Sequence, residues 1–220
     1  MGARGIAGVV FDMDGVLVES ERAWHDIHKG VLADYGYELD DASYRELYGA
    51  SDEVENVVLG RIMGVSPEVA GRRKREYVMR NPIDYAAIVM PGAPEALNSL
   101  KARGLRLALA SSSLAPDVNA MLDQTGLRDR FDAVVTGSDC ERAKPDPAIY
   151  LEACARLGAR PVDLLAVDDS AYGVEAAARA GMRVVHFARD EAGAPHDPSA
   201  VELTCSDFAE LESEIEALLR

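Results

Sequence analysis

The segment Gly8-Val9-Val10-Phe11-Asp12-Met13-Asp14-Gly15 places a short apolar run directly before two aspartates and a glycine. A run of this kind, with β-branched residues and no polar alternation, is typical of a strand buried on both faces in a parallel sheet. Four later runs have the same character, at residues 105–110, 133–135, 163–167 and 182–187. The sequence therefore predicts a parallel sheet whose first strand ends at Asp12.

Segments with helical spacing of apolar residues separate and follow these strands. They begin after Pro94, Pro116, Pro147, Ser170 and Asp207, and Gly104, Gly126, Gly158 and Gly181 follow the first four. Proline near the start and glycine past the end are typical of helix boundaries. The alternation of strands and helices predicts an α/β fold with a doubly wound parallel sheet and right-handed crossovers.

One stretch of about 70 residues, between Ser20 and Pro91, contains no strand pattern and is too long for a connecting loop. Its apolar residues fit helical faces over 24–35 and 54–62, and Ser66-Pro67 has the sequence of a third helix start. We therefore expect an all-helical domain, residues 19–90, inserted into a core domain formed by residues 1–18 and 91–220.

The composition excludes several classes of function. The chain has 220 residues, with 38 acidic and 23 basic side chains, and its net charge of −15 argues against nucleic-acid or anionic-membrane partners. No apolar run reaches the roughly 20 residues that a membrane crossing needs, and residues 1–10 lack a signal-peptide layout. Cys140, Cys154 and Cys205 lie far apart and predict neither a zinc site nor a disulfide framework. We expect a cytoplasmic protein.

Polar side chains follow the predicted strands at their carboxyl ends, where doubly wound sheets bind ligands. These residues are Asp12, Asp14, Ser111, Asp168 and Asp169, with Lys144 after the third strand and a loop. Carboxylates that converge there would repel one another without a cation, and oxygen ligands without His or Cys favour Mg²⁺. A lysine and a serine in the same crevice suit a phosphate group.

These residues carry a resemblance to a known family. Asp12-Met13-Asp14-Gly15-Val16, Ser111, Lys144-Pro145 and Asp168-Asp169-Ser170 resemble the four motifs of the haloacid dehalogenase superfamily of phosphohydrolases. The chain is most similar to the branch shared by sugar-phosphate phosphatases and β-phosphoglucomutases, in which a helical cap follows the first motif. The resemblance covers the whole chain, and it implies a Rossmann-like core with the inserted helical domain as that cap.

The resemblance also implies a mechanism that depends on four carboxylates. Asp12 would be the nucleophile that forms an aspartyl-phosphate, and Asp14 would be the general acid and base. Mg²⁺ would be held by the Asp12 carboxylate, the Asp14 backbone carbonyl and Asp169, with Asp168 bound directly or through water. Because Asp14 is present, phosphoryl chemistry is favoured over dehalogenation.

The remaining predicted site residues would contact the substrate, which we expect to be a small phosphate ester. Ser111, Ser112 and Lys144 would bind the phosphoryl oxygens. We expect Ser111 and Lys144 to be catalytic residues together with Asp12 and Asp14. Trp24 and His25, in the first cap helix, are candidates to contact the rest of the molecule. We expect no nucleic acid or membrane partner, and a monomer or a weak homodimer.

Two positions favour a phosphatase over the alternative, a β-phosphoglucomutase-type phosphosugar mutase. The mutase pattern has a histidine twelve residues after the nucleophile, where this chain has Trp24, with His25 one position later. It also has an arginine after a Gly-x-Ser in the cap, where Gly49-Ala50-Ser51 is followed here by Asp52. An acid at that position would repel a distal phosphate.

Other interpretations stay open. A signalling receiver domain also uses an acidic cluster with a Ser or Thr and a Lys on a doubly wound sheet, but it lacks a large inserted cap. His25 and His28 have no third ligand at metal-binding spacing, so we interpret them as residues that line or flank the cap helix. The basic run 72–75 is interpreted as a solvated helix face that pairs with Glu68 and Glu76.

Overall fold

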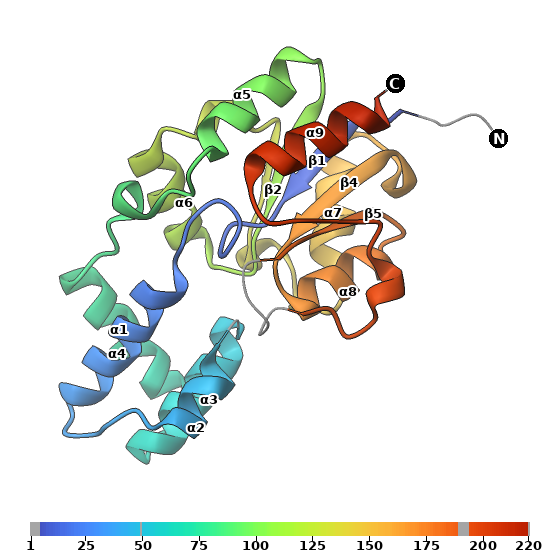
Figure 1. The fold of residues 1–220 in the computed structure, drawn as a ribbon. Coiled ribbons are helices and arrows are strands. Elements are labelled where there is room, and N and C mark those ends of the chain that lie inside the picture. The colour runs from blue at the N-terminus through green and yellow to red at the C-terminus, as the bar shows by residue number, and fades with distance from the viewer. Residues whose placement is uncertain (1–4, 49, 189–193, 220) are drawn as a thin grey trace.

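The computed structural model describes residues 5–48, 50–188 and 194–219, and contains a six-stranded parallel sheet (Figure 1). The strand order is β3-β2-β1-β4-β5-β6, and every neighbouring pair is parallel. The strands are β1 (Gly8–Phe11), β2 (Arg106–Ala110), β3 (Ala133–Val135), β4 (Leu164–Asp168), β5 (Arg183–Phe187) and β6 (Leu203–Cys205). The five predicted strands are therefore confirmed, and β1 lies in the middle of the sheet.

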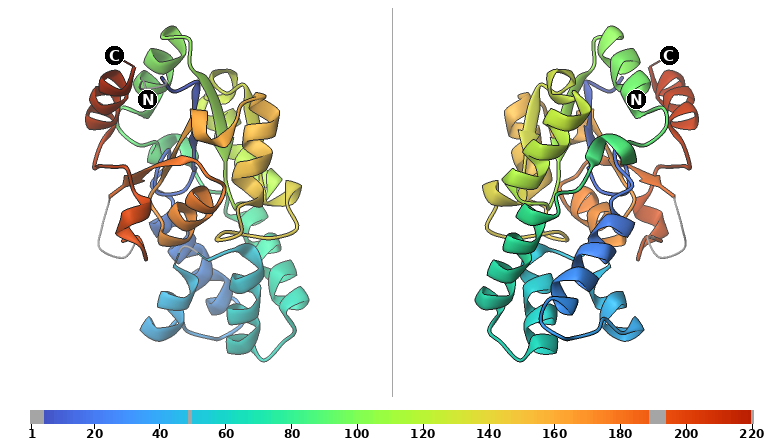
Figure 2. Two further views of the ribbon diagram at one scale, coloured as in Figure 1. Left: turned by 90° about the vertical axis from the view of Figure 1, so that its right-hand side faces the viewer. Right: turned by 90° about the vertical axis from the view of Figure 1, so that its left-hand side faces the viewer.

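The two faces of the sheet are covered by different helices, which confirms the doubly wound fold. Val9 and Phe11 point into a core formed with α5 (Ala93–Ala102), α6 (Ala115–Thr125) and α9 (Phe208–Leu218). Val10 points into a second core, formed with α7 (Ala148–Leu157) and α8 (Ala171–Arg179). Figure 2 shows helices on both faces of the sheet. All four residues of β1 are buried, which agrees with its apolar sequence.

Most helix ends lie where the sequence predicts them. Gly126 and Gly158 are left-handed residues just after α6 and α7, and the side chains of Ser170 and Asp207 accept backbone N–H groups at the starts of α8 and α9. Strand β6 was not predicted, because three residues at a sheet edge are too few to form a recognisable apolar run. Short 3-10 helices occupy Tyr85–Ile88, Arg128–Arg130, Gly137–Asp139, Pro161–Asp163 and Pro198–Ala200.

The insertion after β1 is all-helical, as predicted, but contains four α-helices rather than three. They are α1 (Glu21–Ala33), α2 (Asp41–Leu47), α3 (Asp52–Met63) and α4 (Pro67–Arg80). Helix α2 was missed because it has only seven residues, of which two are buried. The predicted apolar face of α3 is partly wrong, since Val58 is buried whereas Val54 and Val57 are exposed.

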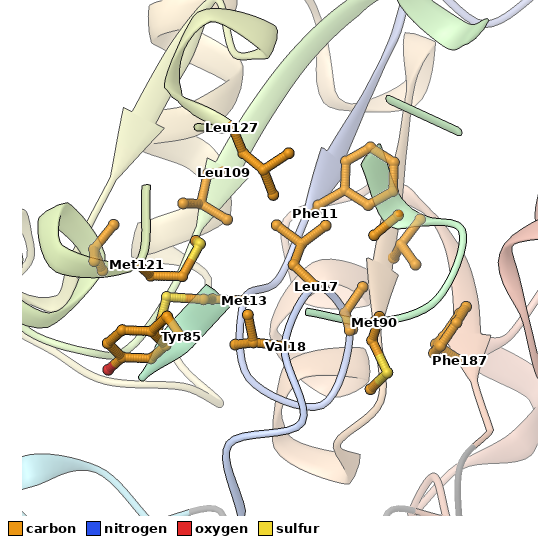
Figure 3. Close-up of a cluster of buried hydrophobic side chains, with 14 of the residues drawn as sticks. Phe11, Met13, Leu17, Val18, Tyr85, Met90, Leu109, Met121, Leu127 and Phe187 are labelled. Atoms are coloured by element: carbon orange, nitrogen blue, oxygen red, sulfur yellow. The ribbon is translucent and has the colours of Figure 1, made fainter. Parts of the chain in front are cut away.

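We call the inserted helices α1–α4 the cap, and the two connections between them and the core domain run side by side. Val18 forms an antiparallel bridge with Val89, the backbone N–H of Glu19 donates to Ile88, and that of Met90 donates to Leu17. Figure 3 shows Leu17, Val18 and Met90 beside Phe11 in one buried apolar cluster. The cap is therefore joined to the core by two connecting segments that are hydrogen-bonded to each other, and apolar side chains of both segments are buried in the core.

Figures 1 and 2 show the helices of the cap beyond the carboxyl edge of the sheet, where the β1–α1 connection begins. Within the three described stretches of chain, no helix is long and apolar enough to cross a bilayer.

Candidate active site

A pocket of about 930 Å³ lies between the carboxyl edge of the sheet and the cap. Its core wall includes Asp12, Asp14, Ser112, Lys144 and Asp169, and its cap wall includes Trp24, His25, His28, Asp52, Glu55 and Lys74. Residues predicted from distant parts of the sequence therefore line one cavity. His25 packs against Tyr44 of α2, with ring centroids 4.4 Å apart, so this wall also depends on the helix that the sequence did not predict.

Lys144 joins two buried carboxylates at the bottom of this pocket. Its Nζ lies 2.5 Å from Asp12 Oδ1 and 2.7 Å from Asp168 Oδ2, and the lysine side chain is 8% exposed. Burial opposes ionisation of this amine, but the adjacent carboxylates of Asp12 and Asp168 outweigh it and raise the pKa of Lys144 well above its usual value. Lys144 is therefore a fixed ammonium group beside Asp12.

The carboxylate of Asp168 is fully engaged by the protein. Oδ2 accepts from Lys144 and from the buried hydroxyl of Tyr150, while Oδ1 accepts from the backbone N–H and the hydroxyl of Ser170, at 2.9 and 2.8 Å. Burial alone would raise the pKa of Asp168, but Lys144 and these hydrogen bonds lower it. In this structure Asp168 orients Lys144, and Tyr150 is a member of the site that sequence reasoning missed.

Asp14 is held by hydroxyl groups instead of a cation. Ser113 Oγ donates to Asp14 Oδ2 at 2.8 Å, Ser20 Oγ donates to Oδ1, and Ser111 Oγ lies 3.5 Å from Oδ2. Burial raises the pKa of Asp14, and the bonds from Ser20 and Ser113 oppose that rise. The serine run at 111–113 was the available signal for Ser113, whereas no motif pointed to Ser20.

The two predicted phosphate-binding serines lie in different surroundings. Ser111 is fully buried, with its hydroxyl directed to Asp14 and to the backbone N–H of Ser113, whereas Ser112 lines the pocket. The geometry therefore relates Ser111 to the arrangement of Asp14, and it leaves Ser112 accessible to a ligand.

Asp169 lies against the turn that follows β1. Gly15 has a φ of +76°, and a Cβ on it would lie 1.9 Å from Asp169 Oδ2, so no side chain fits between the two loops. Asp169 lies close enough to Asp12 for the two charges to interact. Burial raises the pKa of Asp169 well above its usual value, and the negative charges of Asp168 and Asp12 add to this rise.

The donor set suits a hard cation with few protein ligands. No group of three or more His, Cys, Asp and Glu side chains in the described part of the chain is arranged to hold a metal ion. Asp168 is occupied by four donors and Asp14 by serines, which leaves Asp12 and Asp169 as the two carboxylates. Mg²⁺ is commonly bound through one or two carboxylates with water completing its octahedron, so these residues fit it.

The cap contributes a buried lysine that the sequence analysis assigned to solvent. Lys74 is 4% exposed, and its Nζ lies 2.7 Å from Asp52 Oδ1 and in contact with Glu55 Oε2. The interpretation of 72–75 as a solvated face is therefore wrong for Lys74. It lies on the same side of α4 as the buried Ala70, and this i, i+4 spacing was the signal that could have found it.

Comparisons with known proteins agree with this geometry. A family model described as haloacid dehalogenase-like hydrolase matches residues 6–181. The phosphorylated carbohydrates phosphatase of Thermotoga maritima is 31% identical, over 84% of this chain and 91% of its own. Hexitol phosphatase B of Escherichia coli K12 is 30% identical, over 93% and 97%.

A solved structure of β-phosphoglucomutase from Clostridium difficile has the same fold, with a TM-score of 0.79 over 97% of both chains and 21% identity. The family model covers most of the chain, including Asp12 and Ser111, which follow β1 and β2, and Asp168 at the end of β4. The chain therefore belongs to the haloacid dehalogenase-like hydrolases.

Proposed function

We propose that this hydrolase is a Mg²⁺-dependent phosphatase that cleaves a small phosphomonoester, a sugar or polyol phosphate, through an aspartyl-phosphate. The observation that carries the proposal is the Asp12–Lys144–Asp168 contact at the bottom of a pocket that Asp14 also lines. A carboxylate beside a fixed ammonium group suits a phosphoryl group, whose oxygens need positive charge as the transfer proceeds. The phosphatase names of two relatives support the same reaction.

In the proposed reaction, Asp12 attacks phosphorus while the bond from phosphorus to the ester oxygen breaks. Lys144 contacts Asp12 Oδ1, so we assign Oδ2 as the attacking oxygen and the ammonium group as a partner of the phosphoryl oxygens. Asp14 donates its proton to the departing alcohol and then removes one from the water that hydrolyses the aspartyl-phosphate. The raised pKa of Asp14 favours the protonated form that the first step needs.

The proposed cation would be held by Asp12, Asp169 and the backbone carbonyl of Asp14, and Asp168, whose two oxygens already accept four hydrogen bonds, would contribute through water. Mg²⁺ supplies positive charge that offsets repulsion between Asp12 and an anionic phosphate. Ser112 and Lys144 bind the phosphoryl group, and Ser111 helps to hold Asp14. We assign residues 19–90 as the domain that covers the substrate, with Trp24 and His25 in its wall, and residues 1–18 and 91–220 as the catalytic core.

The mutase alternative has less support. Trp24 occupies the position of the expected histidine, and Asp52 follows the cap serine and contacts Lys74. Of that cap motif, Gly49 lies outside the described residues. A mutase must hold a second phosphate in the cap, and an acid at this position disfavours such binding. We further infer a monomer or weak homodimer that acts in the cytoplasm.

The decisive experiment is a phosphate-release assay over hexose, pentose, hexitol, glycerol and glycolate phosphates, with Mg²⁺ and with EDTA. We expect release from at least one ester, loss of release in EDTA, and a fall of at least about a thousandfold in Asp12→Asn, because an amide is a poor nucleophile. Circular dichroism of the variant checks that it is folded. Conversion of glucose 1-phosphate to glucose 6-phosphate faster than phosphate release would favour the mutase instead.

A further inference from the structure

The part of the pocket away from Asp12 is dominated by acidic side chains. Asp52 and Glu55 reach it from α3, Lys74 from α4, and Asp117 from α6 of the core. We call these four residues the distal wall. Glu55 and Asp117 both interact electrostatically with Asp14, the proposed general acid. We therefore expect the distal wall to face the alcohol part of a substrate, to which Asp14 would donate its proton.

The positive charge of the distal wall is already balanced. Lys74 contacts Asp52 and Glu55 at once, and Asp52 Oδ2 also accepts from Asn56 at 2.8 Å. An ammonium group has three donors, so two are used by these carboxylates. One lysine between two acids leaves a net negative charge, in contrast to an arginine that would clamp a second phosphate.

Asp117 adds a further negative charge from the opposite domain. Burial raises the pKa of Asp117 to about 6, against a lowering effect of Lys74, and the carboxyl is therefore ionised in most molecules at pH 7.5. The nearby charges of Asp14, Asp52 and Glu55 make an additional anion in this region unfavourable.

A buried histidine in the same lining lies against a carboxylate of the distal wall. His28 is 2% exposed and lines the pocket, and its Nε2 lies 3.3 Å from Glu55 Oε2. A hydroxyl group can both donate to a carboxylate and accept from an N–H, so it can satisfy groups of both kinds. Arg45 also lines the pocket, but its side chain is exposed on α2.

We infer that the distal wall selects phosphomonoesters whose alcohol is rich in hydroxyl groups and carries no second anionic group, and that it accepts an alcohol with an ammonium group. This inference rests on the proposed phosphatase function and narrows its substrate class. Hydroxyl and ammonium groups can donate to the carboxylates of Asp52, Glu55 and Asp117. A carboxylate or second phosphate would lose its hydration beside like charges, which is costly.

The test compares three esters that share a six-carbon skeleton. Glucitol 6-phosphate is neutral at the far end, 6-phosphogluconate has a carboxylate there, and 2-amino-2-deoxyglucitol 6-phosphate has an ammonium group near it. From phosphate release with Mg²⁺, we expect kcat/KM for 6-phosphogluconate to be at least about tenfold below that for glucitol 6-phosphate. The amino ester should remain within about threefold of glucitol 6-phosphate.

A single charge removal tests the assignment to the distal wall. Asp117→Asn should reduce the discrimination against 6-phosphogluconate by about threefold or more, because it removes one repelling charge. Asp129→Asn makes the same charge change at an exposed position of the core domain, outside the pocket lining. It should leave the ratio of kcat/KM for the two esters unchanged.

The outcomes separate the inference from the function on which it rests. Equal or faster turnover of 6-phosphogluconate by the wild type, or an unchanged ratio in Asp117→Asn, would overturn the inference while phosphate release upholds the phosphatase. If none of the three esters and none of the wider panel releases phosphate, the proposed function fails, and the inference fails with it.

Discussion

Asp12 and Asp14 are the same residue type two positions apart, but their partners differ in chemistry. Asp12 contacts the ammonium group of Lys144, which favours an ionised carboxylate, whereas Asp14 accepts from the neutral hydroxyls of Ser20 and Ser113. A nucleophile must be ionised and a general acid must be protonated. Burial raises the pKa of both carboxyls, that of Asp12 to about 8, while Lys144 opposes this rise at Asp12 and the serine hydroxyls oppose it at Asp14. The proposed roles therefore require that Lys144 and the proposed cation keep Asp12 ionised, and that burial keeps a proton on Asp14.

The serine pair 112 and 113 provides a test at this scale. Ser113→Ala removes a donor at 2.8 Å from Asp14, so we expect kcat to fall about tenfold with a small change in KM, because the acid loses its orientation. Ser112→Ala should mainly raise KM, since Ser112 lines the pocket and we assign it to the phosphoryl group. Steady-state phosphate release measures both constants. The same kinetic pattern in both variants would contradict this division of roles.

At the scale of elements, the site depends on how two loops meet at the carboxyl edge of the sheet. Strands β1 and β4 are neighbours in register, with Phe11 beside Val167, so the residues that follow them are adjacent. Gly15 turns the chain with positive φ and leaves the space that Asp169 fills. The parallel pairing of β1 with β4 is therefore what brings Asp169 next to Asp12.

Gly15→Ala should displace Asp169 and weaken cation binding. A Cβ would meet Asp169 Oδ2 at 1.9 Å, so we expect the Mg²⁺ concentration for half-maximal activity to rise about tenfold or more. Unfolding free energy should also fall by about 1 kcal/mol from the left-handed backbone. A Mg²⁺ titration of phosphate release and a urea denaturation curve measure the two effects.

Gly36→Ala is the matched control for this prediction. Gly36 has a φ of +78° with nothing within 4 Å of the added Cβ, so it should show a similar loss of stability with an unchanged Mg²⁺ response. A normal Mg²⁺ response in Gly15→Ala would contradict the proposed position of Asp169 in the cation site.

At the scale of the whole molecule, the cap and the core bring negative charges together. Asp117 belongs to α6, yet its carboxyl interacts with Lys74, Asp52 and Glu55 of the cap and with Asp14. Burial is the largest cause of its raised pKa. An ionised carboxylate in this position destabilises the folded chain, so its presence is better explained by ligand selection than by folding.

Asp117→Asn should stabilise the protein in a pH-dependent way. The pKa of Asp117 is about 6 in the folded state and about 3.9 when unfolded, so between these pH values the folded state binds more protons. The unfolding free energy of the wild type therefore falls as pH rises from about 4 to 6. Asn at position 117 does not ionise, so the variant does not lose this stability. We expect a gain of about 1–3 kcal/mol above pH 6.5 that shrinks toward pH 4.

Thermal unfolding at pH 4.5 and pH 7.5 checks this expectation. The increase in Tm for Asp117→Asn should be larger at pH 7.5, and Asp129→Asn, the same substitution at an exposed position, is the control. An equal Tm shift for Asp117→Asn at the two pH values would contradict the raised pKa.

The sequence by itself determined five of the six described strands, the helical character of the insertion and the polar residues at the carboxyl edge of the sheet. Runs such as 8–11 and 164–167 are apolar because both faces of the sheet are covered, and the polar residues that follow them mark the carboxyl edge. This information is local in the chain, so periodicity and helix-end residues carry it. Short elements such as β6 and α2 were missed, because three or seven residues give too little pattern.

Only the tertiary structure decided which partner each charged group takes. The contacts of Lys144 with Asp168, of Tyr150 with Asp168 and of Lys74 with Glu55 join residues 24, 18 and 19 positions apart. Burial and pairing of a side chain depend on what other segments bring to it, and no pattern within one segment contains that information. For this reason the sequence predicted Asp12 and Asp14 as a pair, whereas only the folded chain distinguishes their surroundings and defines the distal wall.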